Sequence, residues 1–144
     1  MTPMIFVLNG PNLNLLGTRE PEIYGRETLD DIAAMLTGHA ATLDVELDIR
    51  QSNHEGHLID WLHEADADGA KAVILNAGGF THTSVALHDA VKAVGVPVIE
   101  VHLSNPQARE SFRRRSLVAP VARGSIAGFG ALGYELALDA AARL

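Results

Sequence analysis

The sequence predicts an α/β protein with an open, mostly parallel sheet and helices on both faces. Short apolar runs rich in Val and Ile alternate with longer amphipathic stretches, and this alternation occurs five times. The apolar runs are nearly continuous, as strands covered on both faces require. The 144 residues, 47% hydrophobic and 20% charged, suit one globular domain of ordinary size. We therefore expect a single domain that spans residues 1–144.

The five expected strands cover residues 4–8, 45–49, 72–75, 96–103 and, more weakly, 121–127. The first helical pattern has apolar residues three or four positions apart, on one helix face, at Leu29, Ile32, Leu36, Ala40 and Leu43. Thr28 followed by Asp31 indicates its start, and Ser52 with Glu55 fits a capping box before the next helix. The later helical stretches are residues 57–67, 84–94, 107–115 and 132–144. Five such units predict a flavodoxin-like three-layer sandwich with strand order 2-1-3-4-5.

Composition excludes several classes of protein. The chain has 11 Lys and Arg against 18 Asp and Glu, a net charge of −7, which disfavours nonspecific binding to nucleic acid. The absence of cysteine excludes a disulfide framework, a thiol nucleophile and a cysteine zinc site. No apolar run reaches the roughly 18 residues of a membrane span, and the N-terminal residues do not form a signal-peptide pattern. We expect a cytoplasmic protein that acts on neither nucleic acid nor membrane.

The predicted topology indicates where a ligand binds. In such folds, ligands lie beyond the carboxyl ends of the strands, at the switch in strand order. Here that region comprises the loops after the first, third and fourth strands, which read NGPN at 9–12, NAGG at 76–79 and HLSN at 102–105. All three are rich in polar and small residues, whereas the loops at the opposite edge carry no comparable cluster.

Glu100 and His102 are the first candidate catalytic pair. They are two positions apart on an expected strand, so both side chains point to the same face. A carboxylate beside an imidazole fixes the tautomer of the ring and favours its protonated form, which suits a general acid. The alternative is a buried ion pair that ends the strand and has no catalytic role.

The polar segment GTREPEIYG, residues 17–25, is a candidate lid because it has a glycine at each end. It contains Tyr24, whose phenol is a weak base at neutral pH unless a nearby cation favours the phenolate. Arg19 in the same segment could supply that cation. The alternative is an ordinary surface loop with an aromatic anchor.

Two further groups could bind an anion. Asn76 and His82 flank Gly78 and Gly79 near the expected start of a helix, where free N–H groups suit an anionic ligand. The alternative is that Thr81, Thr83 and Ser84 cap the helix and His82 is exposed. Arg109 and Arg113 are four apart, on one face of the expected 107–115 helix, and could bind a carboxylate or hydroxyl groups. The alternative for these arginines is a solvated basic helix end.

Two apparent motifs predict no cofactor site. GFGALG at residues 128–133 matches a dinucleotide-binding pattern, but too little chain follows it for the required strand and acidic residue, so it predicts tight helix–sheet packing. HEGH at residues 54–57 has the wrong spacing for a zinc motif. Neither motif therefore indicates a cofactor site.

Together these segments resemble the type II 3-dehydroquinate dehydratases over nearly the whole chain. The matching stretches are VLNGPNLN at 7–14, GTREPEIYG at 17–25, QSNHEG at 51–56, NAGGFTHTSVALHD at 76–89 and EVHLSN at 100–105, continuing through Arg113. Members of this family have a flavodoxin-like fold and dehydrate 3-dehydroquinate to 3-dehydroshikimate in the shikimate pathway. They use neither metal nor organic cofactor. The resemblance implies the same fold and activity for this chain.

The resemblance also implies roles for individual residues. Tyr24 would remove a proton from C2 of the substrate, Arg19 would stabilise the negative charge, and His102 would protonate the leaving C1 hydroxyl. Glu100 would orient His102, and Asn12 would hold a water molecule against the enolate oxygen. The remaining implied substrate contacts come from Asn76, His82, Leu103, Ser104, Arg109 and Arg113. Asp89 would reach the site of a neighbouring subunit, in trimers that assemble into a dodecamer.

Three positions depart from the family pattern: His57, Phe80 and His88. Position 88 commonly holds Arg in the family, so His88 could make assembly depend on pH. Two alternative functions are compatible with the same fold. A non-catalytic module that binds a nucleotide or flavin predicts a phosphate loop after the first strand, where this chain has NGPN. A receiver-type module needs clustered acidic residues at that position.

Overall fold

A parallel five-stranded sheet forms the centre of the molecule. The computed structural model describes all residues 1–144 and orders the strands β2-β1-β3-β4-β5, with every neighbouring pair parallel. The strands are β1 (Met4–Asn9), β2 (Glu46–Gln51), β3 (Ala72–Asn76), β4 (Val98–His102) and β5 (Gly124–Ala127). The predicted strand order and flavodoxin-like class are confirmed.

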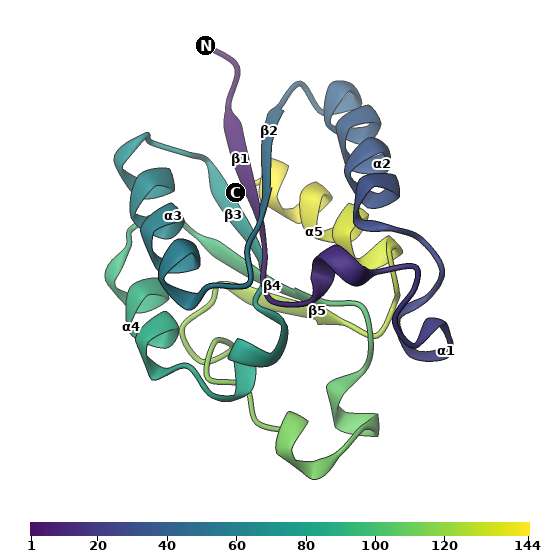
Figure 1. Cartoon of the computed structure of the whole chain (residues 1–144). Helices are drawn as coiled ribbons and strands as arrows, with labels where there is room; N and C mark the ends of the chain where they lie inside the picture. The colour runs from purple at the N-terminus through teal and green to yellow at the C-terminus, as the bar shows by residue number, and fades with distance from the viewer.

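Helices cover both faces of the sheet, giving three layers (Figure 1). Helices α2 (Leu29–Thr42) and α5 (Leu132–Ala142) lie on one face, and α3 (Glu55–Ala67) and α4 (Val85–Ala93) lie on the other. A short helix, α1 (Pro21–Tyr24), lies within the predicted lid segment. None of these helices combines the length and apolar character needed to cross a membrane.

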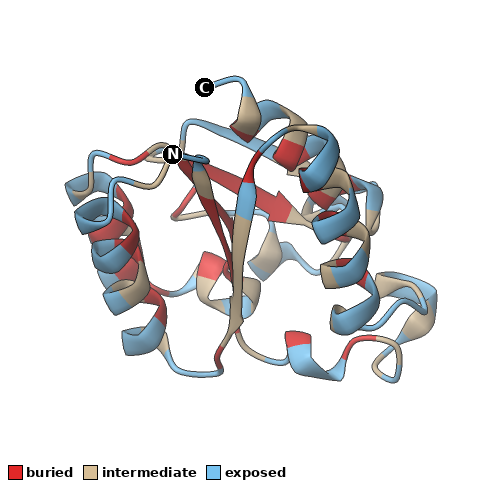
Figure 2. Ribbon diagram, turned by 90° about the horizontal axis from the view of Figure 1, so that it is seen from above, coloured by how far each residue is buried: buried red, intermediate tan, exposed pale blue.

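The alternation of side chains along each strand divides the core into two clusters. Ile5 and Val7 of β1 belong to the cluster under α2 and α5, whereas Phe6 and Leu8 belong to the cluster under α3 and α4. Figure 2 shows the buried residues gathered on the central strands and on the helix faces turned toward them. The central strands therefore need apolar residues at every position, which explains their continuous apolar runs.

The edge strand β2 differs from the expected continuous run. Leu47 and Ile49 pack against the core, while Asp48 and Arg50 alternate with them on the opposite face. The Arg50 guanidinium binds Asp48 at 2.8 Å and also pairs with Glu64 of α3. A strand with a neighbour on one side only is less covered, so polar residues occupy one of its faces.

The predicted helix over residues 107–115 is wrong. The chain there forms two short 3₁₀ turns, Pro106–Ala108 and Ser111–Arg113, separated by Arg109 and Glu110 in non-helical conformations. The segment offers few apolar side chains, and the side chain of Phe112 is exposed. A helix is stabilised mainly by burying an apolar face, and this segment has none to bury.

The capping prediction for the second helix is also wrong, whereas that for the first is confirmed. Thr28 and Asp31 form a reciprocal capping box at the start of α2. In contrast, α3 begins at Glu55 after His54, and Ser52 Oγ accepts a hydrogen bond from the His54 N–H instead. The Glu55 carboxylate accepts a hydrogen bond from the hydroxyl of Ser84.

Candidate active site

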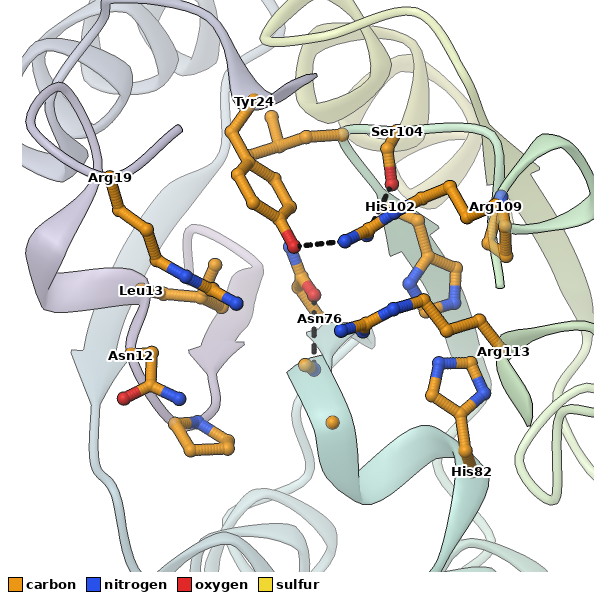
Figure 3. Close-up of a pocket in the computed structure, with 15 residues that line it drawn as sticks. Asn12, Leu13, Arg19, Tyr24, Asn76, His82, His102, Ser104, Arg109 and Arg113 are labelled. Atoms are coloured by element: carbon orange, nitrogen blue, oxygen red, sulfur yellow. Dashed lines mark hydrogen bonds between the residues drawn. The ribbon is translucent and has the colours of Figure 1, made fainter. Parts of the chain in front are cut away.

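A polar pocket lies beyond the carboxyl ends of β1, β3 and β4, where the topology predicts a ligand site. Its volume is about 160 Å³. Ten of the predicted site residues line it: Asn12, Arg19, Tyr24, Asn76, His82, His102, Leu103, Ser104, Arg109 and Arg113. Figure 3 shows these side chains converging from the loops after three strands. Three arginines and no acidic residue line this pocket of an acidic chain, so it suits an anionic ligand.

Two glycines allow the loops after β1 and β3 to pack against each other. A Cβ added to Gly10 would lie 2.5 Å from the Ala77 carbonyl oxygen, so only glycine fits there without movement. Gly78 has φ +58 and lies against Pro11. Asn12 also adopts a left-handed conformation, with φ 68, which asparagine tolerates better than most residues. This contact holds Asn12 and Asn76 beside the same pocket.

Tyr24 lies between two guanidinium groups (Figure 3). Arg109 donates a hydrogen bond to the Tyr24 hydroxyl oxygen at 2.7 Å and another to the Ser104 hydroxyl at 3.1 Å. The Arg19 guanidinium lies over the Tyr24 ring, 4.7 Å from its centre. The cation bonded to the phenol oxygen is thus Arg109, a residue outside the lid segment. Both guanidinium groups thus place positive charge beside the Tyr24 side chain.

Glu100 and His102 interact as their spacing predicts. His102 Nε2 donates a hydrogen bond to Glu100 Oε2 at 2.9 Å, and the Glu100 side chain is only 3% exposed. Ser116 and Ser125 each donate a further hydrogen bond to this carboxylate at 2.6 Å. Burial raises the pKa of Glu100, but the bonds from His102 and the two serines outweigh it and hold this pKa below its ordinary value. Glu100 is therefore a buried anion that orients the imidazole ring.

Asn76 reaches the pocket from the end of β3, and His82 from the 3₁₀ turn that follows, Gly78–His82. The helix predicted over residues 84–94 comes after this turn as α4, which begins at Val85 and is capped by Ser84. His82 Nδ1 donates a hydrogen bond to the Arg115 carbonyl oxygen at 2.8 Å, because a carbonyl oxygen can only accept. Its other ring nitrogen, Nε2, is left for a ligand.

Arg113 reaches the pocket from the second 3₁₀ turn after β4. Its side chain pairs with Glu110. Arg109 and Arg113 thus meet at one pocket because of these turns and not because they share a helix face.

One predicted site residue lies away from the pocket of its own chain. Asp89 is on α4, with its side chain 69% exposed and its Oδ1 3.0 Å from His88 Nδ1. Three residues that support the site were not predicted from the sequence. Ser116, Ser125 and Tyr134 bond to Glu100 or Asn76, and no local spacing identifies them because these contacts join distant parts of the chain. The register of β4 with β5, which pairs Glu100 with Ser125, would have indicated one of them.

The pocket combines a general base candidate, a general acid candidate and an anion-binding field. The phenol of Tyr24 has a cation at its oxygen, and the imidazole of His102 has a carboxylate at Nε2. Such a pair can remove a proton from one atom of a ligand and deliver a proton to another.

The sequence of this chain is similar to those of known proteins over its whole length. The family model described as "Dehydroquinase class II" matches residues 3–142. The chain is 62% identical to a 3-dehydroquinate dehydratase of Hyphomonas neptunium, covering 100% of this chain and 96% of that protein. It is 58% identical to the enzyme of that name from Phenylobacterium zucineum, covering 100% and 99%.

Crystal structures agree with the sequences. The type II dehydroquinase of Propionibacterium acnes superimposes with a TM-score of 0.96 at 44% identity, covering 100% of this chain and 99% of that one. The type II dehydroquinase of Butyrivibrio crossotus gives a TM-score of 0.95 at 42% identity, covering 96% and 97%. The chain belongs to the class II dehydroquinase family.

Proposed function

We propose that this protein is a lyase that removes water from 3-dehydroquinate, giving 3-dehydroshikimate in the shikimate pathway. The family and the full-length similarity to 3-dehydroquinate dehydratases support this activity. The observation that carries it is the pairing, within one pocket, of a phenol bonded to Arg109 with an imidazole bonded to Glu100. The catalytic domain comprises residues 1–144.

The reaction begins with Tyr24 as the general base. Its phenolate, stabilised by the hydrogen bond from Arg109 and by the charge of Arg19, takes the proton from C2 next to the ketone. The electrons of the broken C–H bond move onto the ketone oxygen and form an enolate. Asn12 holds a water molecule that stabilises the enolate oxygen, because donors fixed in advance lower the energy of developing charge.

His102 completes the elimination as the general acid. The enolate returns its electrons to form the C1–C2 double bond, and the C1 hydroxyl leaves with a proton from His102 as water. Since Nε2–H of the ring bonds to Glu100, the transferred proton comes from Nδ1 of the imidazolium. Tyr24 gains one proton and His102 loses one, so the substrate loses one water molecule and the enzyme has no net change in protons. These steps are a stepwise elimination through an enolate, and we propose that it is anti, with the C2 proton and the C1 hydroxyl leaving from opposite faces of the ring.

The other pocket residues hold the anionic substrate. The backbone of Leu103 and Ser104, together with Asn76, binds the carboxylate and ring hydroxyls. His82 offers Nε2 and Arg113 its guanidinium to hydroxyl groups, and Arg109 adds positive charge. The reaction needs no metal and no organic cofactor in this scheme. We place the enzyme in the cytoplasm, as a dodecamer built from trimers in which Asp89 reaches a neighbouring site.

The alternative, a non-catalytic flavodoxin-like ligand-binding module, is not favoured. Binding alone does not call for a phenol bonded to a guanidinium cation together with an imidazole bonded to a carboxylate. The relatives at high identity over the whole chain are named as enzymes.

The decisive assay follows the ultraviolet absorbance of the conjugated enone product after addition of 3-dehydroquinate. We expect the wild-type rate to survive a metal chelator and borohydride treatment, which inactivates Schiff-base enzymes. Tyr24→Phe and His102→Ala should each lower kcat about 10²- to 10⁴-fold, the usual contribution of a general acid or base. A folded wild-type protein without activity would overturn the proposal, and loss of activity with chelator would overturn its metal-free chemistry.

A further inference from the structure

Tyr134, a buried residue of α5, is joined to the active site by a chain of hydrogen bonds. Its side chain is 0% exposed, and its hydroxyl oxygen lies 2.9 Å from Asn76 Nδ2 and 2.7 Å from Asn9 Oδ1. Asn9 ends β1 and Asn76 ends β3, so the phenol connects a helix to the ends of two central strands. Asn76 lines the pocket and Tyr134 does not.

A backbone group at each end of this series of hydrogen bonds determines which atoms donate and which accept. Asn9 Nδ2 donates to the Arg50 carbonyl oxygen at 3.1 Å, and this oxygen can only accept. Asn9 therefore presents its Oδ1 to Tyr134, whose O–H proton is used in that bond. The phenol oxygen must then accept from Asn76 Nδ2. At the other end, the Gly78 N–H can only donate, and it donates to Asn76 Oδ1 at 3.2 Å.

We propose that Tyr134 is a positioning residue that fixes the orientation of the Asn76 side-chain amide. A flipped amide would place Oδ1 beside the phenol oxygen and the NH₂ group beside the Gly78 N–H. Two acceptors would then meet at the buried Tyr134 end and two donors at the partly buried Gly78 end, which is costly. One N–H of Asn76 Nδ2 is left over, and the amide presents it to the pocket as a donor.

The two tyrosines of the chain thus serve opposite purposes. Tyr24 lies at the pocket between two guanidinium groups. Tyr134 is surrounded by apolar residues and two amides, and burial raises its pKa above the ordinary value despite the hydrogen bond from Asn76. Tyr134 consequently keeps its proton and stays a donor to Asn9. A phenylalanine has nearly the same shape but has no hydroxyl to donate to Asn9 and to accept from Asn76.

Kinetics of Tyr134→Phe test the inference, which rests on the proposed function through the role of Asn76 in substrate binding. The variant leaves Asn9 Oδ1 and Asn76 Nδ2 without their partner. We expect KM for 3-dehydroquinate to rise about tenfold, the usual cost of a mispaired polar group, while kcat changes less than about threefold. In an Asn76→Ala background, Tyr134→Phe should add no further rise, because it acts through Asn76.

Leu138→Ala is the matched control for a purely structural effect. Leu138 is on the same helix, one turn after Tyr134, and is equally buried, but it makes no polar contact. It should lower the melting temperature without changing KM. Three results would overturn the inference: an equal rise in Leu138→Ala, an additive effect in the double variant, or an unchanged KM in Tyr134→Phe when Asn76→Ala does raise KM.

A crystal structure of Tyr134→Phe separates this inference from the proposed function. We expect the Asn76 amide to rotate or to take two orientations. An amide unmoved in the variant would overturn the inference whatever the kinetics. A rotated amide with unchanged KM, together with unchanged KM in Asn76→Ala, would instead refute the substrate contact assigned to Asn76, while its orientation by Tyr134 would stand.

Discussion

Glu100 is an ionised side chain in a place where an unpaired charge would be very costly. Its carboxylate is compensated by three donors: the His102 ring and the hydroxyls of Ser116 and Ser125. The pair with His102 follows from their spacing on a strand, and it was predictable for that reason. The serines were not, because Ser116 lies in the loop after β4 and Ser125 on the neighbouring strand, so neither shares a local pattern with Glu100.

Removing one of these donors should shift the pH dependence of the reaction. The folded pKa of Glu100 lies below its ordinary value, so the stabilising charge is fully present above that ordinary value and is lost as pH falls through the folded pKa. Ser125→Ala should raise this pKa, because it removes a hydrogen bond that favours the charged carboxylate. The acid limb of kcat/KM and of thermal stability should both move to higher pH.

The conservative variant Ser125→Thr provides the control, because it keeps the hydroxyl and suits an edge strand. Its acid limb should match the wild type. An acid limb in Ser125→Ala that also matches the wild type would mean that this hydroxyl does not stabilise the Glu100 charge.

At the scale of elements, the loops and turns that follow the strands bring the site together. Periodicity predicts the long helices and central strands, since these elements bury one face or two. It fails for residues 107–115, where two 3₁₀ turns bring Arg109 to Tyr24, a residue 85 positions earlier in the chain. That segment lacks an apolar stripe, so the contacts of its arginines with the rest of the site determine its shape.

The close contact between the loops after β1 and β3 predicts a sensitive position. Gly10→Ala would place a Cβ 2.5 Å from the Ala77 carbonyl oxygen, a backbone atom that cannot move aside alone. We expect a loss of about 1 to 3 kcal/mol in unfolding free energy, as for other overpacked sites, and a fall in kcat/KM because Asn12 shifts. Denaturant unfolding and the enone assay measure both effects.

Gly38→Ala is the matched control because Gly38 lies within α2 with nothing within 4 Å of the added Cβ. The same chemical change should stabilise the protein by about 0.5 to 1 kcal/mol through helix propensity and leave activity unchanged. Equal behaviour of the two variants would contradict the steric explanation for Gly10.

For the whole molecule, the sequence predicts the architecture better than it predicts the exact element boundaries. Two apolar clusters, one on each face of the sheet, correspond to the alternation of strand and helix patterns. The parallel strands end at one edge, so the predicted loops meet there without further information. An arrangement of several chains cannot be predicted in this way, because exposed side chains such as Asp89 leave no periodic pattern.

Assembly provides a test of the exposed Asp89 and its neighbour. Between pH 8 and pH 5.5 an imidazole gains a proton. A positively charged side chain at position 88, beside Asp89, would resemble the arginine common at this position in the family. We expect sedimentation equilibrium to show tighter assembly at pH 5.5 than at pH 8. His88→Arg should remove this difference, and one and the same oligomer for the wild type at both pH values would contradict the expectation.

The three arginines that line the small pocket also have a pharmacological consequence. A tight inhibitor must carry the charge opposite to that of the arginines, so it will be an anion of about the substrate's size. The negative charge of such an inhibitor opposes its passage through a lipid bilayer, because an ion loses its hydration in hydrocarbon at a high cost in free energy. Potency against the purified enzyme and entry into cells are therefore opposing demands on such a compound. Esters that are hydrolysed after uptake offer a way to satisfy both.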